Sequence, residues 1–270
     1  LIQALCRRAD SGDVTDLHFH HFHTEGPAPY SEPQYEGIFF EQGFFVGPNV
    51  RKNVNAGYAD YLPVHLGESQ KLYRCGFIKL GAALVNVSLP DANGMVSLGT
   101  SVDCSVAAIE SAELVIGVVN PNVPYALGDL VSLDKFDYLV SDDTPLVTAN
   151  FAEPTPTEVL IGKNCAALVE DGDCIQMGIG ALPNALAAQL KDHKNLGLHT
   201  EMFADGLMRL IKSGVINGKC KKIDTGKVVA SFLLGSHDVY SFINNNPDVL
   251  MRDIKYTNDP WVIAQNPHMK

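Results

Sequence analysis

The stretch Val228-Val-Ala-Ser-Phe-Leu-Leu234 indicates the fold most directly, because it is apolar with almost no alternation. A second run of the same kind is Val115-Ile-Gly-Val-Val119. A strand with one face in water alternates apolar and polar residues, whereas a strand buried on both faces does not. Continuous runs of this length therefore favour strands of a parallel sheet that helices cover on both sides.

Helical patterns and short apolar runs alternate on either side of these two stretches. Strands alternating with helices of about ten residues are typical of α/β proteins, so we expect that class. The expected strands are 17–21, 61–66, 83–89, 114–119, 138–140, 174–177, 196–199 and 228–234. The expected helices are 50–56, 69–75, 102–111, 158–169, 183–191, 203–213 and 239–244, and the chain also opens in a helical pattern at 1–6.

Composition places the chain among ordinary globular proteins and excludes several functional classes. Its 270 residues are 46% hydrophobic and 19% charged, and the formal net charge is −11. Disordered chains lack such an apolar share. The acidic balance argues against a general nucleic-acid-binding protein, because no basic stripe is available to neutralise phosphates. No window of 18 uncharged apolar residues occurs, so we expect no membrane-spanning helix.

Proline and acidic residues gather between residues 141 and 157, where the chain reads Ser-Asp-Asp-Thr-Pro and then Ala-Glu-Pro-Thr-Pro-Thr. Linkers between domains have this composition. We therefore predict two α/β domains, residues 1–150 and 151–270. The chain begins at Leu1 inside a helical pattern, with neither an initiator methionine nor a recognisable targeting peptide, which indicates a piece of something longer.

The cysteines and histidines favour no metal or redox site. The six cysteines contain no C-x-x-C pair, so we expect buried, reduced thiols of an intracellular protein. Four histidines gather in the first predicted strand and the loop after it. Alternate residues of a strand face opposite sides, so one strand cannot bring all four to one ion. The histidines are His18, His20, His21 and His23, and the cysteines are Cys6, Cys75, Cys104, Cys165, Cys174 and Cys220.

A glycine-rich turn in Gln176-Met-Gly-Ile-Gly-Ala-Leu-Pro-Asn-Ala-Leu186 is the first candidate for chemistry. A strand enters a turn with Gly178 and Gly180, and Pro183 opens a helix, as proline does well in a first turn. Glycines let backbone amides approach a ligand, and a helix N-terminus favours an anion. An ordinary tight turn explains the same residues. The spacing is not G-x-G-x-x-G, so a dinucleotide site is not supported.

A second polar loop follows the strand that ends at His199. It carries Thr200, Glu201 and Asp205, and in open α/β sheets ligands bind beyond the carboxyl ends of strands. If the two strands are neighbours, Glu201 faces the Gly178–Gly180 turn, where a carboxylate acts as a base or as a nucleophile. The alternative is that Glu201 only caps the helix that follows, since first turns favour acids.

The segment Ser97-Leu-Gly-Thr-Ser-Val-Asp-Cys-Ser105 is the third candidate. We expect a strand, a glycine turn and then a helix with Ser101 as its N-cap, which is the ordinary role of serine in that position. Neither a G-x-S-x-G elbow nor a G-x-x-x-x-G-K-[ST] loop occurs in the sequence. A serine hydrolase and a P-loop nucleotide site are therefore disfavoured.

Taken together, these segments resemble the family I CoA-transferases of the acetyl-CoA hydrolase / 4-hydroxybutyrate CoA-transferase group. The resemblance runs through almost the whole chain, and its matches follow in family order. The most specific are Met177–Leu186 and the Leu-His-Thr-Glu-Met-Phe-Ala-Asp-Gly segment of 198–206. The other matching segments are 24–30, 44–66, 94–103, 120–124, 245–247 and 256–260.

The resemblance implies a fold, a mechanism and a set of site residues. It implies two open α/β domains of CoA-transferase type in a chain truncated at both ends. Glu201 corresponds to the family nucleophile, which forms a glutamyl-CoA thioester while CoA moves between an acyl-CoA and a short carboxylate of the acetate or 4-hydroxybutyrate class. CoA and acyl-CoA are then substrates, with no tightly bound cofactor and no metal. The residues corresponding to a CoA-contacting segment are Gly178, Ile179, Gly180, Ala181 and Leu182.

Two departures leave the acyl preference open. Val123-Pro-Tyr-Ala126 stands where members often carry Met-Pro-Arg-Thr, and Tyr58 stands where an arginine is common. The resemblance also implies a homo-oligomer with small-molecule substrates, in the bacterial cytoplasm or the mitochondrial matrix. The alternatives are an acyl-CoA hydrolase, in which water replaces the second carboxylate, and a non-catalytic CoA-binding fragment.

Overall fold

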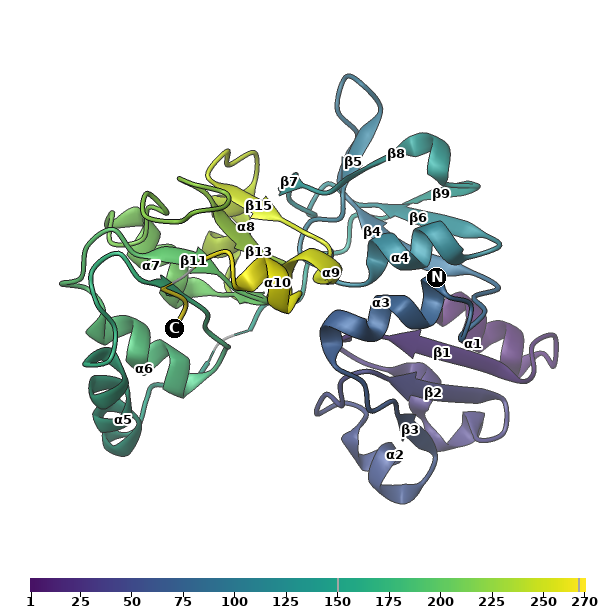
Figure 1. The fold of residues 1–270 in the computed structure, drawn as a ribbon. Coiled ribbons are helices and arrows are strands. Elements are labelled where there is room, and N and C mark those ends of the chain that lie inside the picture. Colours follow the sequence, from purple (N-terminus) through teal and green to yellow (C-terminus); the bar gives the residue numbers. More distant parts are fainter. Residues whose placement is uncertain (150, 267) are drawn as a thin grey trace. The chain divides into compact units, whose positions relative to one another are not determined.

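The computed structural model describes residues 1–149, 151–266 and 268–270, and it divides the chain into two compact units, 1–69 and 70–270 (Figure 1). The first unit holds a parallel sheet in the order β1-β2-β3. Its core contains Cys6, Ala9, Tyr30, Tyr35 and Phe39. Its elements are α1 (Ile2–Asp10), β1 (Leu17–His21), short 3-10 turns at Pro29–Ser31 and Pro33–Tyr35, β2 (Phe39–Gly43), α2 (Arg51–Ala56) and β3 (Ala59–Tyr61), and α3 (Leu66–Arg74) follows across the boundary.

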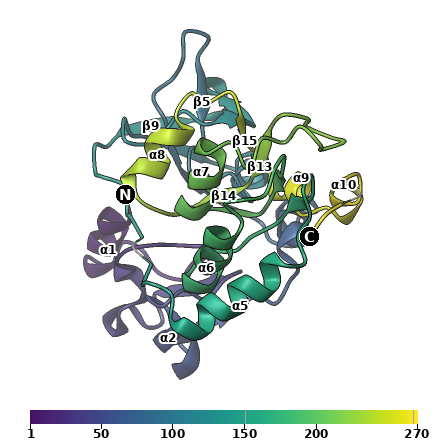
Figure 2. The same cartoon turned by 90° about the vertical axis from the view of Figure 1, so that its left-hand side faces the viewer.

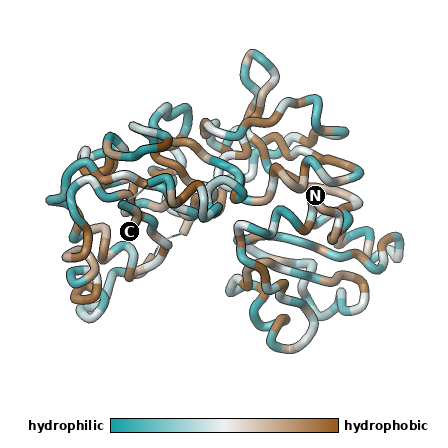
Figure 3. Tube along the Cα trace, in the orientation of Figure 1, coloured by the Kyte–Doolittle hydropathy of each residue, from teal (hydrophilic) through white to brown (hydrophobic). Residues whose placement is uncertain are grey.

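A five-stranded parallel sheet forms the centre of the second unit, in the order β10-β11-β13-β15-β7. The strands are β7 (Leu127–Gly128), β10 (Cys174–Ile175), β11 (Gly197–His199), β13 (Val228–Ala230) and β15 (Val249–Met251). The two-stranded parallel sheet of β12 (Met202–Phe203) and β14 (Phe232–Leu233) continues β11 and β13. The buried runs of these strands carry the hydrophobic colour in Figure 3.

Two smaller sheets complete the strands of this unit. The parallel one has the order β4-β6-β9, from β4 (Ala83–Val87), β6 (Val115–Val119) and β9 (Tyr138–Ser141). The antiparallel one pairs β5 (Met95–Ser97) with β8 (Leu130–Ser132), and a 3-10 turn at Leu133–Lys135 follows. Apart from this pair, every strand pairing among the described residues is parallel, so the α/β class with mostly parallel sheets is confirmed.

The helices of the second unit pack closely where the sequence provides glycine. A Cβ on Gly162 of α5 would lie only 2.8 Å from the carbonyl carbon of Ala185, so glycine lets α5 and α6 touch backbone to backbone (Figure 2). Thr155 and Glu158 form a reciprocal capping box that starts α5 at Pro156. The helices are α4 (Ser105–Ser111), α5 (Pro156–Ala166), α6 (Ala181–Gln189), α7 (Asp205–Lys212), α8 (His237–Ile243), α9 (Ile254–Thr257) and α10 (Pro260–Ile263).

Several predicted elements need correction. The strand expected at 61–66 is β3, which ends at Tyr61, because Pro63 has no N–H for a ladder and α3 begins at Leu66. The helix expected at 102–111 begins at Ser105, because the amides of Val102 and Asp103 are bound to the carbonyl of Ser231. The strand expected at 228–234 is interrupted at Ser231, between β13 and β14.

Strand pairing joins residues from the two sides of the linker predicted at 141–157. Leu127 and Gly128 of β7 pair with Leu250 and Met251 of β15. Asn150, at which the predicted domain boundary falls, lies outside the described residues. The division into domains 1–150 and 151–270 stays a prediction.

The cysteines are free thiols, but only half of them are buried. Cys6, Cys104 and Cys174 lie in cores, whereas the other three, Cys75, Cys165 and Cys220, are exposed. The expectation of buried thiols is therefore wrong for those three, each of which lies at the surface in or near a helix end or loop. Within residues 1–149, 151–266 and 268–270, no helix has the length and apolarity to cross a membrane.

Candidate active site

Two neighbouring strands of the central sheet are interrupted at the same level, and the candidate site lies at this break. Thr200 and Glu201 separate β11 from β12, and Ser231 separates β13 from β14. The Glu201 carbonyl accepts hydrogen bonds from the amides of Ser231 (3.0 Å) and Phe232 (2.9 Å). These bonds hold the backbone of Glu201 in place although it belongs to no strand.

The glycine turn lies beside this break, as the sequence predicts for neighbouring strands. β10 and β11 pair in parallel, so the segments that follow them reach the same edge of the sheet. The Thr200 hydroxyl donates to the carbonyl of Met177 (2.8 Å) and accepts from its amide (3.2 Å). This buried threonine ties the segment of Glu201 to the residue directly before Gly178.

The five residues expected to contact CoA span the turn and the first positions of α6. Gly178 is exposed, Ile179 and Gly180 are half-buried, and Ala181 and Leu182 begin α6. Gly180 has a φ of 114°, a conformation that L side chains rarely adopt, and it precedes the helix as its N-cap. Pro183 lies in the first turn of α6 instead of opening it, because the helix begins two residues earlier.

Glu201 is half-buried, and its carboxylate is bound by the neutral side-chain amide of Asn258. Asn258 Nδ2 donates to Glu201 Oε2 over 2.6 Å. Burial raises the pKa of Glu201 above its ordinary value, the hydrogen bond from Asn258 lowers this pKa in part, and the charge of Asp103 raises it. Glu201 does not cap α7, whose N-cap is Ala204, so the capping alternative is wrong.

Two residues that are hydrogen-bonded to Glu201 carry unpaired polar atoms. Ser231 Oγ and Asn258 Oδ1 are buried and have no hydrogen-bond partner among the described residues. Buried polar atoms are normally paired, and the exceptions often mark functional sites. Both residues are linked directly to Glu201, Ser231 through its amide and Asn258 through its side chain.

Asp103 is hydrogen-bonded to Ser231, which is itself bound to Glu201. Its amide donates to the carbonyl of Ser231 (3.2 Å), and its side chain is 2% exposed. Burial raises the pKa of Asp103, against hydrogen bonds from Ser101 and the Cys104 amide. The prediction that Ser101 is the N-cap of α4 is therefore wrong. Cys104 takes that position, without a side-chain cap, while the Ser101 hydroxyl is bound to Asp103.

The other polar residues of the loop after β11 have structural partners. His199 is buried, and its Nε2 donates to the carbonyl of Thr257 over 2.8 Å, which ties β11 to the end of α9. Burial lowers the pKa of His199, so the neutral ring is favoured. The Asp205 carboxylate accepts hydrogen bonds from the amide and hydroxyl of Ser236.

The histidine cluster of β1 is dispersed among acidic partners. His18 lies near Asp16 (3.5 Å), His21 Nε2 lies 2.8 Å from Glu41 Oε1, and His23 Nε2 lies 3.2 Å from Glu25. Among the described residues, no group of three or more histidine, cysteine, aspartate or glutamate side chains could hold a metal ion.

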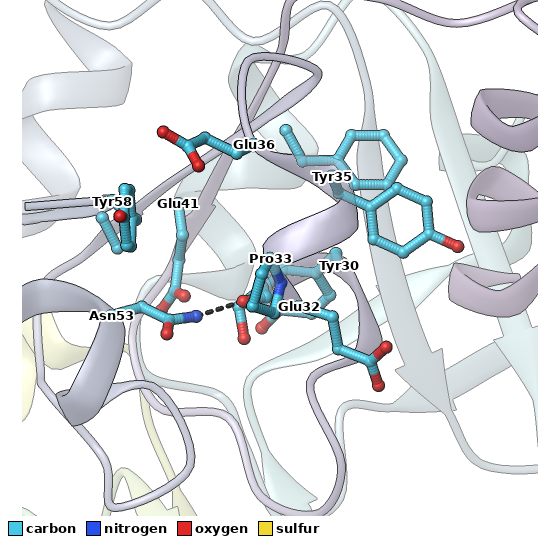
Figure 4. Close-up of a pocket in the computed structure, with 11 residues that line it drawn as sticks. Tyr30, Glu32, Pro33, Tyr35, Glu36, Glu41, Asn53 and Tyr58 are labelled. Carbon is cyan, nitrogen blue, oxygen red and sulfur yellow. Dashed lines mark hydrogen bonds between the residues drawn. The ribbon is translucent and has the colours of Figure 1, made fainter. Parts of the chain in front are cut away.

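A small pocket in the first unit contains none of the predicted site residues (Figure 4). Its volume is about 20 Å³, which is room for a single water. Glu41, Asn53 and Tyr58 line it, together with the 3-10 turns around Pro33. Such a volume is far below that of a pocket for an organic substrate.

The sequence predicted no site role for Asn258 or for Ser231. Asn258 lies in Tyr256-Thr-Asn-Asp-Pro260, one of the segments that resemble the family. Asn258 is 57 residues from Glu201 in the chain, and only the fold brings the two together. Its position directly after the one-turn helix α9 does not by itself indicate a functional role.

Comparison with known proteins identifies the family. The model of the acetyl-CoA hydrolase/transferase N-terminal domain matches residues 1–149, and that of the C-terminal domain matches residues 235–270. The chain belongs to the acetyl-CoA hydrolase/transferase family. The family resemblance read from the sequence is thereby confirmed.

Among curated relatives, this family member is 41% identical to a succinyl-CoA:acetate/propanoyl-CoA:succinate CoA transferase of Fasciola hepatica, over 99% of this chain and 56% of the relative. It is 40% identical to a 4-hydroxybutyrate coenzyme A transferase of Clostridium kluyveri, over 100% of this chain and 62% of that protein. The chain thus spans about three fifths of the length of these relatives.

Solved structures agree with the family and its fold. RipA from Yersinia pestis has a TM-score of 0.92 and 31% identity, covering 100% of this chain and 65% of that one. A 4-hydroxybutyrate CoA-transferase from Porphyromonas gingivalis has a TM-score of 0.80 and 33% identity, covering 100% of this chain and 73% of that one.

Proposed function

We propose that this chain carries the nucleophile of a CoA-transferase, and that Glu201 is this nucleophile. The observation that supports the proposal is the half-buried Glu201 carboxylate at a break in a parallel sheet, bound by the side-chain amide of Asn258 over 2.6 Å. The curated relatives are named as CoA transferases with several different acyl groups, which supports CoA transfer as the reaction class. The substrates we propose are an acyl-CoA and a short carboxylate of the acetate or 4-hydroxybutyrate class.

The chemistry begins with a carboxylate attack on a thioester. A Glu201 oxygen bonds to the acyl carbon, the C–S bond breaks, and a mixed acyl–glutamyl anhydride and CoA thiolate result. The thiolate then attacks the glutamyl carbonyl carbon, and the acyl carboxylate leaves. A glutamyl-CoA thioester remains on Glu201. A second carboxylate reverses the two steps and departs as the new acyl-CoA, so the energy of the thioester is preserved.

The surroundings of Glu201 suit this sequence. Only the ionised carboxylate is nucleophilic, and donation from the neutral Asn258 amide favours ionisation without adding a permanent positive charge. Partial burial strengthens the carboxylate as a base, because it raises the pKa of Glu201. Exclusion of water protects the anhydride from hydrolysis.

The glycine turn is the proposed contact for CoA. The residues are Gly178, Ile179, Gly180, Ala181 and Leu182, and the bonds between Thr200 and Met177 hold this turn beside Glu201. The chain has a formal charge of −11, so its overall field does not attract polyanionic CoA. Local backbone amides at the start of α6 are therefore the groups we propose for this contact.

Chemical trapping tests the proposal. The protein is incubated with an acyl-CoA and reduced with borohydride, which converts a glutamyl thioester into an alcohol, and the modified residue is located by mass spectrometry. We expect the modification at Glu201, and none in Glu201→Gln. Modification of another residue, or transfer activity in Glu201→Gln, would falsify the assignment.

Release of free thiol separates the transferase from the hydrolase. With acyl-CoA alone, a transferase stops at the glutamyl thioester, whereas a hydrolase releases thiol continuously. Added acetate should lead to acetyl-CoA in the first case and change little in the second. CoA binding with neither product would indicate a non-catalytic fragment.

A further inference from the structure

Asp253 is a hydrogen-bonding centre at the start of α9, the helix that ends next to Asn258. Its Oδ1 accepts from the amide of Lys255 (2.7 Å), which caps the helix, and its own amide donates to Asp129 Oδ2 (2.7 Å). Its carbonyl accepts from the amides of Tyr256 (2.9 Å) and Thr257 (3.1 Å). The amide, the carbonyl and Oδ1 of Asp253 are thus all hydrogen-bonded, and together these bonds fix where α9 begins.

Arg74 holds the remaining oxygen of Asp253. Arg74 Nη2 donates to Asp253 Oδ2 over 2.8 Å, its Nε donates to Glu110 (2.7 Å), and its Nη1 donates to Gln70 (2.8 Å). The side chains of Arg74 and Asp253 are 23% and 11% exposed, so water competes little for this pair. Three directions of donation from one planar guanidinium define an orientation that a lysine cannot reproduce.

α9 depends on such anchors because it is too short to be stable alone. It has four residues, one turn, and an isolated helix needs roughly 12 to 15 residues to persist in water. The backbone amide of Ile254 donates to the carbonyl of Asp103, and the backbone amide of Asn258 donates to the carbonyl of Ile254. The position of the Asn258 side chain therefore follows from where Asp253 is held.

We propose that Arg74 is a positioning residue of the active site: by holding Asp253 it fixes α9, and α9 places the Asn258 amide on the Glu201 carboxylate. The kinetic consequence rests on the proposed function, but the positioning itself does not. Buried ion pairs contribute little net stability compared with apolar residues of the same volume. The pair of Arg74 and Asp253 thus serves mainly to specify geometry.

A different route from Arg74 to Glu201 has to be separated from this one. The charge of Arg74 could act through space, alongside Asp103, which faces Glu201, and Glu110, Asp129 and Asp253, which surround the arginine and α9. A field effect persists when Asn258 is removed. An effect transmitted through α9 disappears with the Asn258 side chain. A double-mutant cycle between the two residues therefore distinguishes the two routes.

The experiment measures the titration of the Glu201 carboxyl by carbon-13 NMR of glutamate-labelled protein, with Glu201→Gln identifying the signal. Asn258→Ala should raise the pKa of Glu201, because a donor to the ionised form is lost. Arg74→Lys, which keeps the charge, should raise this pKa in the same direction and should add no shift in the Asn258→Ala background. Asp253→Asn, which changes the same pair from its other side, should reproduce the result. Arg209→Lys, on the exposed face of α7, is the matched control and should leave the signal unchanged.

Two outcomes overturn the proposal: a Glu201 pKa unchanged in Arg74→Lys and Asp253→Asn, or an equal shift with and without Asn258. Circular dichroism and melting of each variant exclude a general loss of structure. Failure of the proposed function is seen separately, because it leaves Glu201 unlabelled in the borohydride experiment whatever the titration shows. If the proposed function of Glu201 and the positioning role of Arg74 both hold, kcat falls about 10- to 100-fold in Asn258→Ala and by a smaller factor in Arg74→Lys. Small misplacements of catalytic groups lower the reaction rate.

Discussion

Two glutamates, the buried Glu41 and the half-buried Glu201, have opposite kinds of partner. Glu41, in the middle of β2, is 4% exposed, and its Oε1 lies 2.8 Å from His21 Nε2, beside a pocket of about 20 Å³ (Figure 4). Glu201 lies where two strands are interrupted, and its partner is the neutral amide of Asn258. A titratable partner inside a regular ladder suits a structural pair. At the break between strands, the neutral side-chain amide of Asn258 leaves the Glu201 carboxylate able to react.

The backbone around the two residues differs in the same sense. Glu41 pairs within a regular ladder, opposite Phe19 and Ala59. Glu201 is outside any strand, with its carbonyl bound by two successive amides. Burial alone therefore does not mark a reactive carboxylate. Unpaired buried atoms do not separate the two sites either, because Glu41 Oε2 and His21 Nδ1 lack a hydrogen-bond partner among the described residues, as Ser231 Oγ and Asn258 Oδ1 do. The feature that distinguishes Glu201 is its place at a break between strands.

Neutralising each glutamate gives the largest expected contrast. Glu201→Gln should reduce acyl transfer by about 10⁴-fold or more, since removal of a covalent nucleophile has effects of that size. The measurement is the steady-state rate of acyl exchange. A rate within tenfold of the unmodified protein would end the distinction between the two residues.

Glu41→Gln should act on stability instead. Glutamine keeps one oxygen that can accept from His21 Nε2, but the bond loses its charge and the other oxygen becomes a buried NH2 donor, which costs about 1 to 2 kcal/mol in the free energy of unfolding. Urea unfolding measures this cost, and borohydride trapping at Glu201 should persist in the folded variant. An unchanged free energy of unfolding would show that the buried pair contributes nothing.

Alanine substitutions at two glycines of the turn beside Glu201 form a matched pair with a smaller expected effect. Gly180→Ala should cost about 1 to 3 kcal/mol, because Gly180 has a φ of 114° and an L side chain is strained there. Gly178→Ala should cost less than about 0.5 kcal/mol, because a Cβ there would meet nothing closer than Pro183 at 3.9 Å. Thermal unfolding compares the two, and equal costs would contradict the conformational argument.

The pH dependence of stability gives the smallest expected difference. Burial raises the pKa of Glu201 in the folded chain, so the folded state binds this proton more tightly than the unfolded state. As pH rises above the ordinary glutamate value of about 4.3, that proton is lost at a cost and the contribution to stability falls. Glu201→Gln should therefore be more stable than the unmodified protein at neutral pH, and the difference should vanish below pH 4. Melting temperatures across this range give the comparison.

Sequence patterns predicted the second unit well where a strand or helix is regular. The run Val115–Val119 is β6, and the neighbouring placement of β10 and β11 brings the two polar loops to one edge, as expected. The interruption at Ser231 was not predictable, because the residues on both sides are apolar and the ladder is broken by long-range bonds: the Ser231 amide donates to the Glu201 carbonyl, and the Asp103 amide donates to the Ser231 carbonyl. The role of Asn258 was not predictable for the same reason, because it depends on a contact with Glu201 that only the fold creates.

Short strands account for most of the remaining differences. β2 was not predicted, since Phe39-Phe-Glu-Gln-Gly43 is only partly apolar and its buried Glu41 is acceptable only with His21 beside it. β7 has two residues, and β15 has three. Periodicity needs a longer window to indicate a strand.

The pairing of β7 with β15 also constrains the order in which the chain folds. Leu127 and Gly128 occupy the edge of the central sheet, but their partners are Leu250 and Met251. During synthesis the β7 segment leaves the ribosome long before its partner exists, and contacts so distant in sequence close slowly. After β15 has been made, its side of the sheet stays an unpaired edge until β7 pairs with it, and chains associate at such edges. We therefore expect mutations that weaken β7 to reduce the yield of soluble protein during expression more than they reduce the activity of the molecules that fold.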